Sequence, residues 1–230
     1  MGRYLHYFDT QADFIDAYKN EYEEPWVSCV SGDSSVEYNF PKYVDLGLPS
    51  RTIWQTMNVG ATNPYDPGYE FKWGETVPST SANTYIFGNS APYTKYNPTD
   101  EKSVLELVDD AAFAAYDGDD EWYASVPTVQ QMLELRNNCT VSYDMGNNLV
   151  IYTSKKNGRR IVFPGKVGKT VLGKPDIGIW TSTINSNYAA YGRANALLAT
   201  AESRTYSLSI DPINRYELHN IRGVLNPVLK

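Results

Sequence analysis

Residues 44–54 read VDLGLPSRTIW, and this stretch opens an ordered series of short motifs that decides the predicted fold. The series continues through Asn-Val-Gly-Ala at 58–61, Trp-Gly-Glu at 73–75, Val-Leu-Glu-Leu at 104–107, Asp-Asp-Ala-Ala at 109–112, Trp122, Pro-Thr at 127–128, Leu133, Asn-Asn-Cys-Thr at 137–140, Trp-Thr-Ser at 180–182 and Ile-Arg-Gly-Val at 221–224. None of these pieces is an active-site signature, so it is their order that carries information.

The series resembles a module abundant in gut Bacteroidetes and their phages, the Fibrobacter succinogenes major paralogous domain-like module. That module is related to the C-type lectin-like fold and to phage variable tropism proteins. The resemblance covers residues 43–230, although relatives more often end on a Val-Arg-Pro-Val-like motif. It implies an α+β fold with two helices, twisted and mainly antiparallel sheets, and long loops. Such a fold usually displays a binding surface instead of performing chemistry.

Sequence patterns also predict two helices in a mainly stranded frame, which describes an α+β domain. One helix is expected from about Asp109, and another over 128–138, where Thr128 and Gln131 form a capping box. Strands are expected at about 43–48, 52–57, 70–73, 140–143, 149–153, 159–163, 179–184, 204–210 and 220–225. Residues 78–100 lack an apolar period and predict a long loop, a kind of segment that is often functional.

Residues 1–42 are predicted to form a separate attachment unit, a helix followed by one hairpin. A capping-box-like start at Thr10 precedes the helix, and strands are expected at 26–30 and 36–40. So small a unit is not stable alone. We expect it to pack on the 43–230 domain, on a second subunit or on another virion protein. Its sequence also resembles leaders of Bacteroides-phage structural proteins, and the resemblance implies a homo-oligomer, with a trimer as the favoured form.

The charge and cysteine content restrict the partners that the chain can have. The 20 basic and 27 acidic residues give a net charge of −7, which disfavours nucleic acid unless a basic patch exists. The best candidate patch, residues 155–160, has an Asn-Gly centre and is predicted to be a hairpin turn. Cys29 and Cys139 fall in different predicted units, so reduced thiols are expected and not a disulfide scaffold.

Motifs for catalysis are missing from the sequence. Gly-x-Ser-x-Gly, His-Glu-x-x-His and the P-loop do not occur, and His6 and His219 lie outside any motif. Asp109 and Asp110 are interpreted as a helix cap, and the acidic run 117–121 as a solvated turn. The Glu-Pro-Asn, Gln-Pro-Asp and Trp-Asn-Asp signatures of calcium-dependent sugar binding are also absent. We therefore predict no enzymatic activity, no cofactor and no metal; a structural calcium in the acidic turn is left open.

The remaining candidate site is a display surface late in the chain. In the related tropism proteins, ligand-facing residues lie around the last sheet, and the matching stretch begins after residues 180–182 and ends near Arg222. Its candidate ligand contacts are Asn185, Asn187, Tyr188, Tyr191, Arg193, Asn195, Tyr206, Asn214, Arg215 and Tyr216. Mixtures of Tyr, Asn and Arg combine rigid aromatic contacts with adaptable hydrogen bonds. Alternatively, the tyrosines only cover the sheet. The core framework is expected to include Trp54, Trp73, Trp122 and Trp180.

We expect a bacteriophage structural protein that displays this domain on a tail, fibre or capsid, where it binds a host-surface glycan or protein. The N-terminus lacks the apolar region of a signal peptide and no apolar stretch is long enough to span a membrane, which favours synthesis in the host cytoplasm and release in the virion. One alternative is a purely architectural decoration or joint between virion proteins. Another is a bacterial surface adhesin, against which the missing signal peptide argues.

Overall fold

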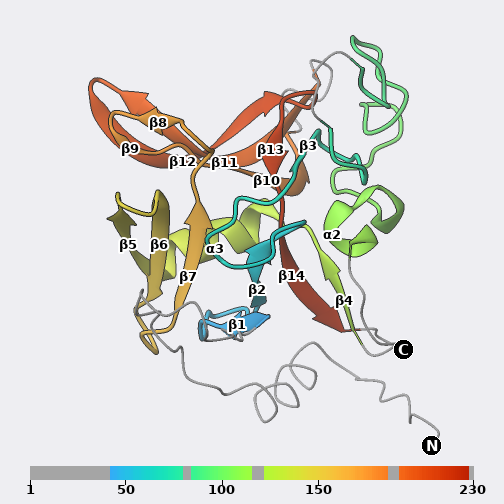
Figure 1. Ribbon diagram of the computed structural model, residues 1–230. Coiled ribbons are helices and arrows are strands. Elements are labelled where there is room, and N and C mark those ends of the chain that lie inside the picture. The colour runs from blue at the N-terminus through green and yellow to red at the C-terminus, as the bar shows by residue number, and fades with distance from the viewer. Residues whose placement is uncertain (1–41, 80–83, 116–121, 186–191, 228–230) are drawn as a thin grey trace, which may run out of the picture.

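The computed structural model describes residues 42–79, 84–115, 122–185 and 192–227 (Figure 1). The predicted attachment unit, the acidic run 117–121 and the candidate contacts Asn187, Tyr188 and Tyr191 lie outside these ranges, apart from Lys42. Strands predominate in the described chain, with few helices, so the predicted α+β class is confirmed at that level. None of the described helices is long and apolar enough to cross a membrane.

Four sheets and three helical segments make up the described fold. In chain order they are β1 Tyr43–Asp45, β2 Ile53–Asn58, β3 Glu70–Phe71, η1 Leu107–Asp109, α2 Ala111–Ala114, β4 Trp122–Ser125, α3 Val129–Asn138, β5 Cys139–Asp144, β6 Leu149–Ser154, β7 Arg160–Pro164, β8 Thr170–Val171, β9 Lys174–Pro175, β10 Gly178–Ile184, β11 Arg193–Glu202, β12 Thr205–Asn214, β13 His219–Asn220 and β14 Arg222–Pro227.

The first and last sequence motifs meet in one sheet of order β1-β2-β14-β4. Strand β14, from the closing Ile-Arg-Gly-Val motif, lies antiparallel to β2, with Val224 opposite Trp54 and Arg222 opposite Asn58. The other side of β14 pairs with β4. Residues at the two ends of the described chain therefore depend on each other for their backbone hydrogen bonds.

A second sheet has the order β12-β11-β10-β13-β3, and its β10–β13 pair is parallel. Its long antiparallel hairpin, β11–β12, pairs from Arg193 with Asn214 at the root to Glu202 with Thr205 at the tip. Figure 1 shows this hairpin extending from the body beside the short β8–β9 pair. The third sheet is the meander β5-β6-β7.

Helix α3 lies between the sheets and begins at the predicted capping box (Figure 1). Gln131 N donates to Thr128 Oγ1 over 3.2 Å, and Thr128 N donates to Gln131 Oε1 over 2.8 Å. Two backbone donors at the helix start are thereby satisfied. Met132 and Leu135 carry the buried face of the helix into the core.

Two apolar clusters form the core. Trp73 and Trp180 belong to the cluster around β3, β10 and α2, whereas Trp54 belongs to the cluster around α3 and the β5–β7 sheet. All three are buried, which confirms their predicted place, and the side chain of Trp122 lies outside the description. Strands β4 and β11 and the short β8–β9 pair were not predicted.

Candidate functional site

The described members of the predicted late surface lie along the β11–β12 hairpin and its flanking turns. Arg193 and Asn214 are cross-strand partners at the root, and Tyr206 faces Ala201 near the tip. Tyr206 and Asn214 are eight residues apart on one strand, which at about 3.4 Å per residue separates them by roughly 27 Å. A single small ligand cannot contact both ends, so the predicted surface divides into two parts.

The root group, defined as Asn185, Arg193, Asn195, Asn214 and Tyr216, uses much of its hydrogen-bonding capacity internally. Asn195 is almost fully buried; its Nδ2 donates to Thr183 O over 3.2 Å, and its Oδ1 accepts from Asn185 Nδ2 over 3.0 Å. Asn214 Nδ2 donates to Glu217 Oε1 over 3.3 Å. Tyr216 packs against the apolar cluster of Trp73 and Trp180. These contacts fix the hairpin root.

Arg215 lies in the core, so the expectation that it contacts a ligand is corrected here. Its side chain has no exposed surface, Nη1 donates to Lys95 O over 3.1 Å, and Nη2 donates to Tyr96 O. The guanidinium carbon lies 5.4 Å from the centroid of the Trp73 ring and 4.8 Å from that of Tyr93. Such cation–π contacts gain strength when the charge is desolvated. Arg215 therefore fastens the 84–100 loop to the sheet.

The described part of the predicted long loop, residues 84–100, has no helix or strand, as expected, but it is built into the core. Tyr85, Tyr93 and Tyr96 are buried, and the rings of Tyr96 and Trp73 meet edge to face with centroids 5.0 Å apart. The Tyr85 hydroxyl donates to Trp73 O over 2.8 Å. These tyrosines cover the sheet and hold the loop in place.

The tip cluster, defined as Tyr143, Lys174 and Tyr206, brings together β5, β9 and β12. The Tyr143 and Tyr206 rings meet edge to face with centroids 5.2 Å apart. Lys174 Nζ lies 4.5 Å from the centroid of the Tyr143 ring and 5.2 Å from that of Tyr206. Both rings are half-buried, and desolvation raises the pKa of both hydroxyls. The cluster is thus an aromatic surface that carries one ammonium group.

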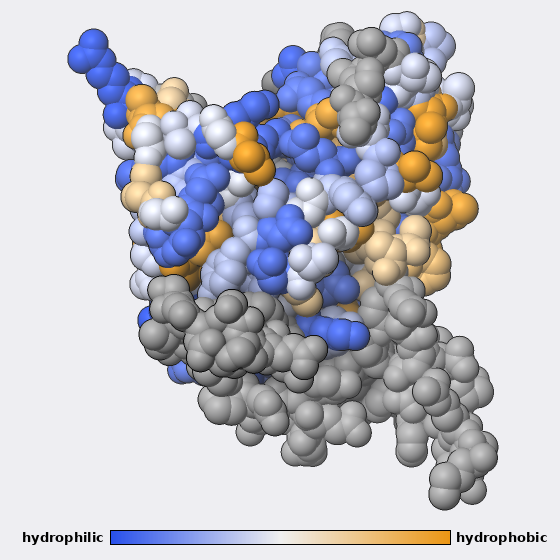
Figure 2. All heavy atoms as spheres, in the orientation of Figure 1, coloured by the Kyte–Doolittle hydropathy of each residue, from blue (hydrophilic) through white to orange (hydrophobic). Residues whose placement is uncertain are grey.

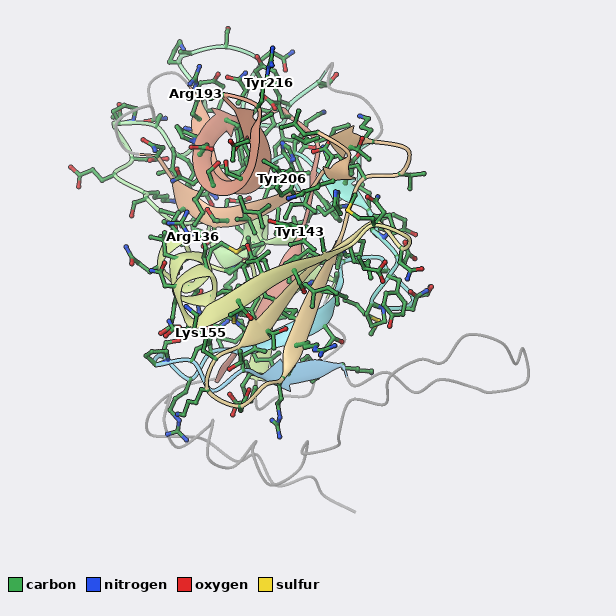
Figure 3. The ribbon with its side chains drawn as sticks, turned by 90° about the vertical axis from the view of Figure 1, so that its left-hand side faces the viewer. Arg136, Tyr143, Lys155, Arg193, Tyr206 and Tyr216 are labelled. Atoms are coloured by element: carbon green, nitrogen blue, oxygen red, sulfur yellow. The ribbon has the colours of Figure 1, made fainter. Side chains whose placement is uncertain are left out.

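The Tyr206 hydroxyl is fixed because it donates to Pro175 O over 2.8 Å, which ties β12 to the end of β9. Figure 3 shows Tyr206 and Tyr143 one above the other on the face where the hairpin meets the β5–β7 sheet, with Arg193 and Tyr216 toward the hairpin root. Only Tyr206 was among the predicted contacts. Tyr143 carried no signal of its own, because it belongs to another sheet and joins the cluster only through the fold.

Three groups that could take part in acid–base or nucleophilic chemistry, Asp110, Cys139 and His219, are buried. The carboxylate of Asp110 accepts from Phe113 N and Val126 N, so it caps α2 as expected. His219 is buried with its ring edge-on to Trp180, and burial lowers its pKa, which keeps it neutral. Burial raises the pKa of the Cys139 thiol to about 11, so it remains protonated at neutral pH. In the described ranges no group of three or more His, Cys, Asp or Glu side chains is placed to hold a metal.

The basic run 155–160 forms the predicted hairpin turn between β6 and β7. Ser154 N donates to Arg159 O over 2.8 Å, and Gly158 takes a φ of +74°, a value that favours glycine. Asn157 Nδ2 donates to Asp45 O over 3.0 Å, which joins the turn to β1. This run is therefore an ordered tip that rests on the first motif.

Comparison with known proteins gives no match to a family model, a curated protein or a solved structure.

Proposed function

We propose that the chain is a bacteriophage virion protein whose C-type lectin-like domain, residues 43–230, binds a glycan or protein on the host surface. The tip cluster carries this proposal. It places two half-buried tyrosine rings from separate sheets beside the ammonium of Lys174. Rigid aromatic side chains with a polar edge are effective contact residues because they lose little conformational entropy on binding.

The ordered motif series supports the lectin-like part of the proposal. Its first and last pieces supply β2 and β14, which pair directly. Its middle pieces supply the cap of α3 and the buried Trp180. The motifs thus act as a framework, as in a module whose conserved scaffold presents a variable surface. Attachment through residues 1–42 and assembly as a homo-oligomer, with a trimer as the favoured form, belong to the same proposal.

A competition experiment tests the proposal. Purified chain is added to susceptible Bacteroidetes cells before the phage that encodes it, and adsorption is measured. If the domain binds the receptor, excess wild-type chain slows adsorption in proportion to its concentration, and antibody against the domain labels the outside of intact particles. If neither effect is seen, receptor binding is wrong.

The architectural alternative has an observation in its favour. Exposed apolar side chains gather on and around η1 and α2, namely Val104, Leu107, Val108 and Phe113. Figure 2 shows hydrophobic residues at the edge of the molecule where Figure 1 places α2, whereas the centre of that face is mainly hydrophilic. Apolar patches of this kind mark protein contacts. If the alternative holds, Val108→Asp should block incorporation of the chain into phage particles. The same substitution should leave the binding of the soluble chain to cells unchanged.

A further inference from the structure

A half-open cavity of about 210 Å³ lies on the face shared by β3 and β13, and none of its lining residues belongs to the tip cluster or the root group. Its lining comes from three separate segments: Pro67, Gly68 and Glu70; Lys166, Val167 and Lys169; and Asn220. Pockets that enclose drug-sized ligands are usually about 300–1,000 Å³. This cavity is therefore large enough to hold one small ring, and too small for a larger ligand.

Asn220 forms a fixed part of the cavity wall. Its Nδ2 donates to Pro67 O over 2.8 Å and to Tyr69 O over 3.0 Å, and two carbonyl acceptors fix which end of the amide is nitrogen. These two bonds hold the backbone of residues 67–69 against β13.

Glu70 and Lys166 add one acceptor and one donor on the same side. Glu70 is the cross-strand partner of Asn220, so both side chains leave the β3–β13 pair on one face. Lys166 Nζ donates to Leu218 O over 2.9 Å and lies 3.3 Å from Glu70 Oε1. The ammonium is held in place by these contacts and keeps a third N–H for a ligand.

Lys169 gives the cavity a net positive charge. Lys166 and Glu70 compensate each other, whereas Lys169 is exposed on the rim and forms no ion pair within the described part of the chain. The loop that carries Lys169 is fixed by a backbone hydrogen bond, which Lys166 N donates to Asp176 O over 2.8 Å. Gly68 forms the opposite wall, where a Cβ would lie 2.5 Å from Val59 O, so the wall is set by bare backbone.

We propose that this cavity binds a hydroxyl-bearing monoanion of the size of one acidic sugar residue, such as a hexuronate. Ring hydroxyls donate to Glu70, and the carboxylate accepts from Lys169 and the free N–H of Lys166. None of the lining residues belongs to the tip cluster, so this inference does not depend on receptor binding through that cluster.

The test is a titration of the full ¹⁵N-labelled chain with D-glucuronate, followed by NMR, with D-glucose and acetate as comparison probes. Glucuronate is expected to shift the amide signals of Gly68, Val167 and Lys169, together with the side-chain NH₂ signals of Asn220. Glucose lacks the charge and acetate lacks the hydroxyls, so each should need at least about tenfold more ligand for the same shift.

Two charge-matched variants make the test specific. Lys169→Gln should weaken glucuronate binding by about tenfold and leave glucose binding unchanged, because only the contact with the carboxylate is lost. Lys156→Gln, on the exposed β6–β7 turn, should bind as the wild type does. Tyr143→Ala, which leaves the hydrogen bond from Tyr206 to Pro175 O in place, should also leave glucuronate binding intact, which separates this site from the tip cluster. The inference fails if glucuronate shifts none of these signals, if acetate binds equally well, or if Lys169→Gln has no effect.

Discussion

Arg222 Nε donates to Asn58 Oδ1 over 2.9 Å, and both side chains are almost completely buried. The other two guanidinium nitrogens donate to backbone, Nη1 to Gln55 O over 3.2 Å and Nη2 to Val162 O over 2.8 Å. Burial lowers the pKa of Arg222 to about 9, which still leaves it charged at neutral pH. The final strand is thereby joined to β2 and β7 by one cation, which the dipoles of a side-chain amide and two backbone carbonyls stabilise.

Replacing Arg222 by Met should lower the free energy of unfolding by at least about 3 kcal/mol, because three buried acceptors lose their donor. Urea unfolding followed by tryptophan fluorescence measures this change. Arg160→Met, at an exposed position on β7, is the matched control and should stay within about 0.5 kcal/mol of the wild type. A loss of less than about 1 kcal/mol for Arg222→Met would show that the buried guanidinium is not a structural link.

The cap of α3 gives a second prediction. Thr128→Ala removes the side-chain acceptor for Gln131 N and should cost about 1 kcal/mol. Thr128→Ser keeps the hydroxyl and should remain close to the wild type in the same unfolding experiment. Equal stabilities of the Ala and Ser variants would mean that the capping box contributes nothing measurable.

Local signals in the sequence were sufficient to predict helix α3 and the hairpin turn at 155–160. Thr128 and Gln131 are three residues apart, and the Asn-Gly pair lies within the turn it forms, so the interactions are set by neighbouring residues. Strand β11 had no such signal. Its sequence, RANALLATAE, is rich in Ala and Leu, which favour helices, and it is a strand because β10 and β12 pair with both of its edges.

The candidate site depended on tertiary contacts even more strongly. Arg215 lies between Asn214 and Tyr216 in a segment with the composition of a contact surface, yet its guanidinium packs on the rings of Trp73 and Tyr93 and donates to the backbone of the 84–100 loop. Tyr143 lies 63 positions before Tyr206 and meets it only when the β5–β7 sheet packs against the hairpin. No spacing within a short window could predict either arrangement.

The pH dependence of the unfolding free energy should reveal the raised pKa of Asp110. Desolvation raises the pKa of its carboxyl to about 6, against 3.8 for an ordinary aspartate, even though backbone N–H groups partly oppose this shift. Between those pH values the folded chain binds a proton that the unfolded chain does not, so this group stabilises the fold as pH falls through 6 and the gain is complete below 3.8. The full gain relative to neutral pH is up to about 3 kcal/mol.

Asp110→Asn removes this titration while all other groups stay in place, so the difference between the two proteins isolates it. The free energy of unfolding of the wild type, minus that of Asp110→Asn, should rise between pH 7 and about pH 4.5. Urea unfolding across this range measures the difference. If this difference in unfolding free energy is constant, or falls as the pH is lowered, the pKa of the Asp110 carboxyl is not raised in the folded chain.

We propose that the tip cluster binds a ligand on the host surface, and direct binding of labelled chain to a panel of Bacteroidetes cells and their purified surface glycans tests this proposal. We expect saturable binding to at least one member of the panel, weakened at least about tenfold by Tyr143→Ala together with Tyr206→Ala. Lys174→Gln should weaken it less, and Tyr69→Ala, at an exposed tyrosine outside the cluster, should leave it unchanged. Binding to none of the panel, or equal binding by a folded double variant, would contradict the claim.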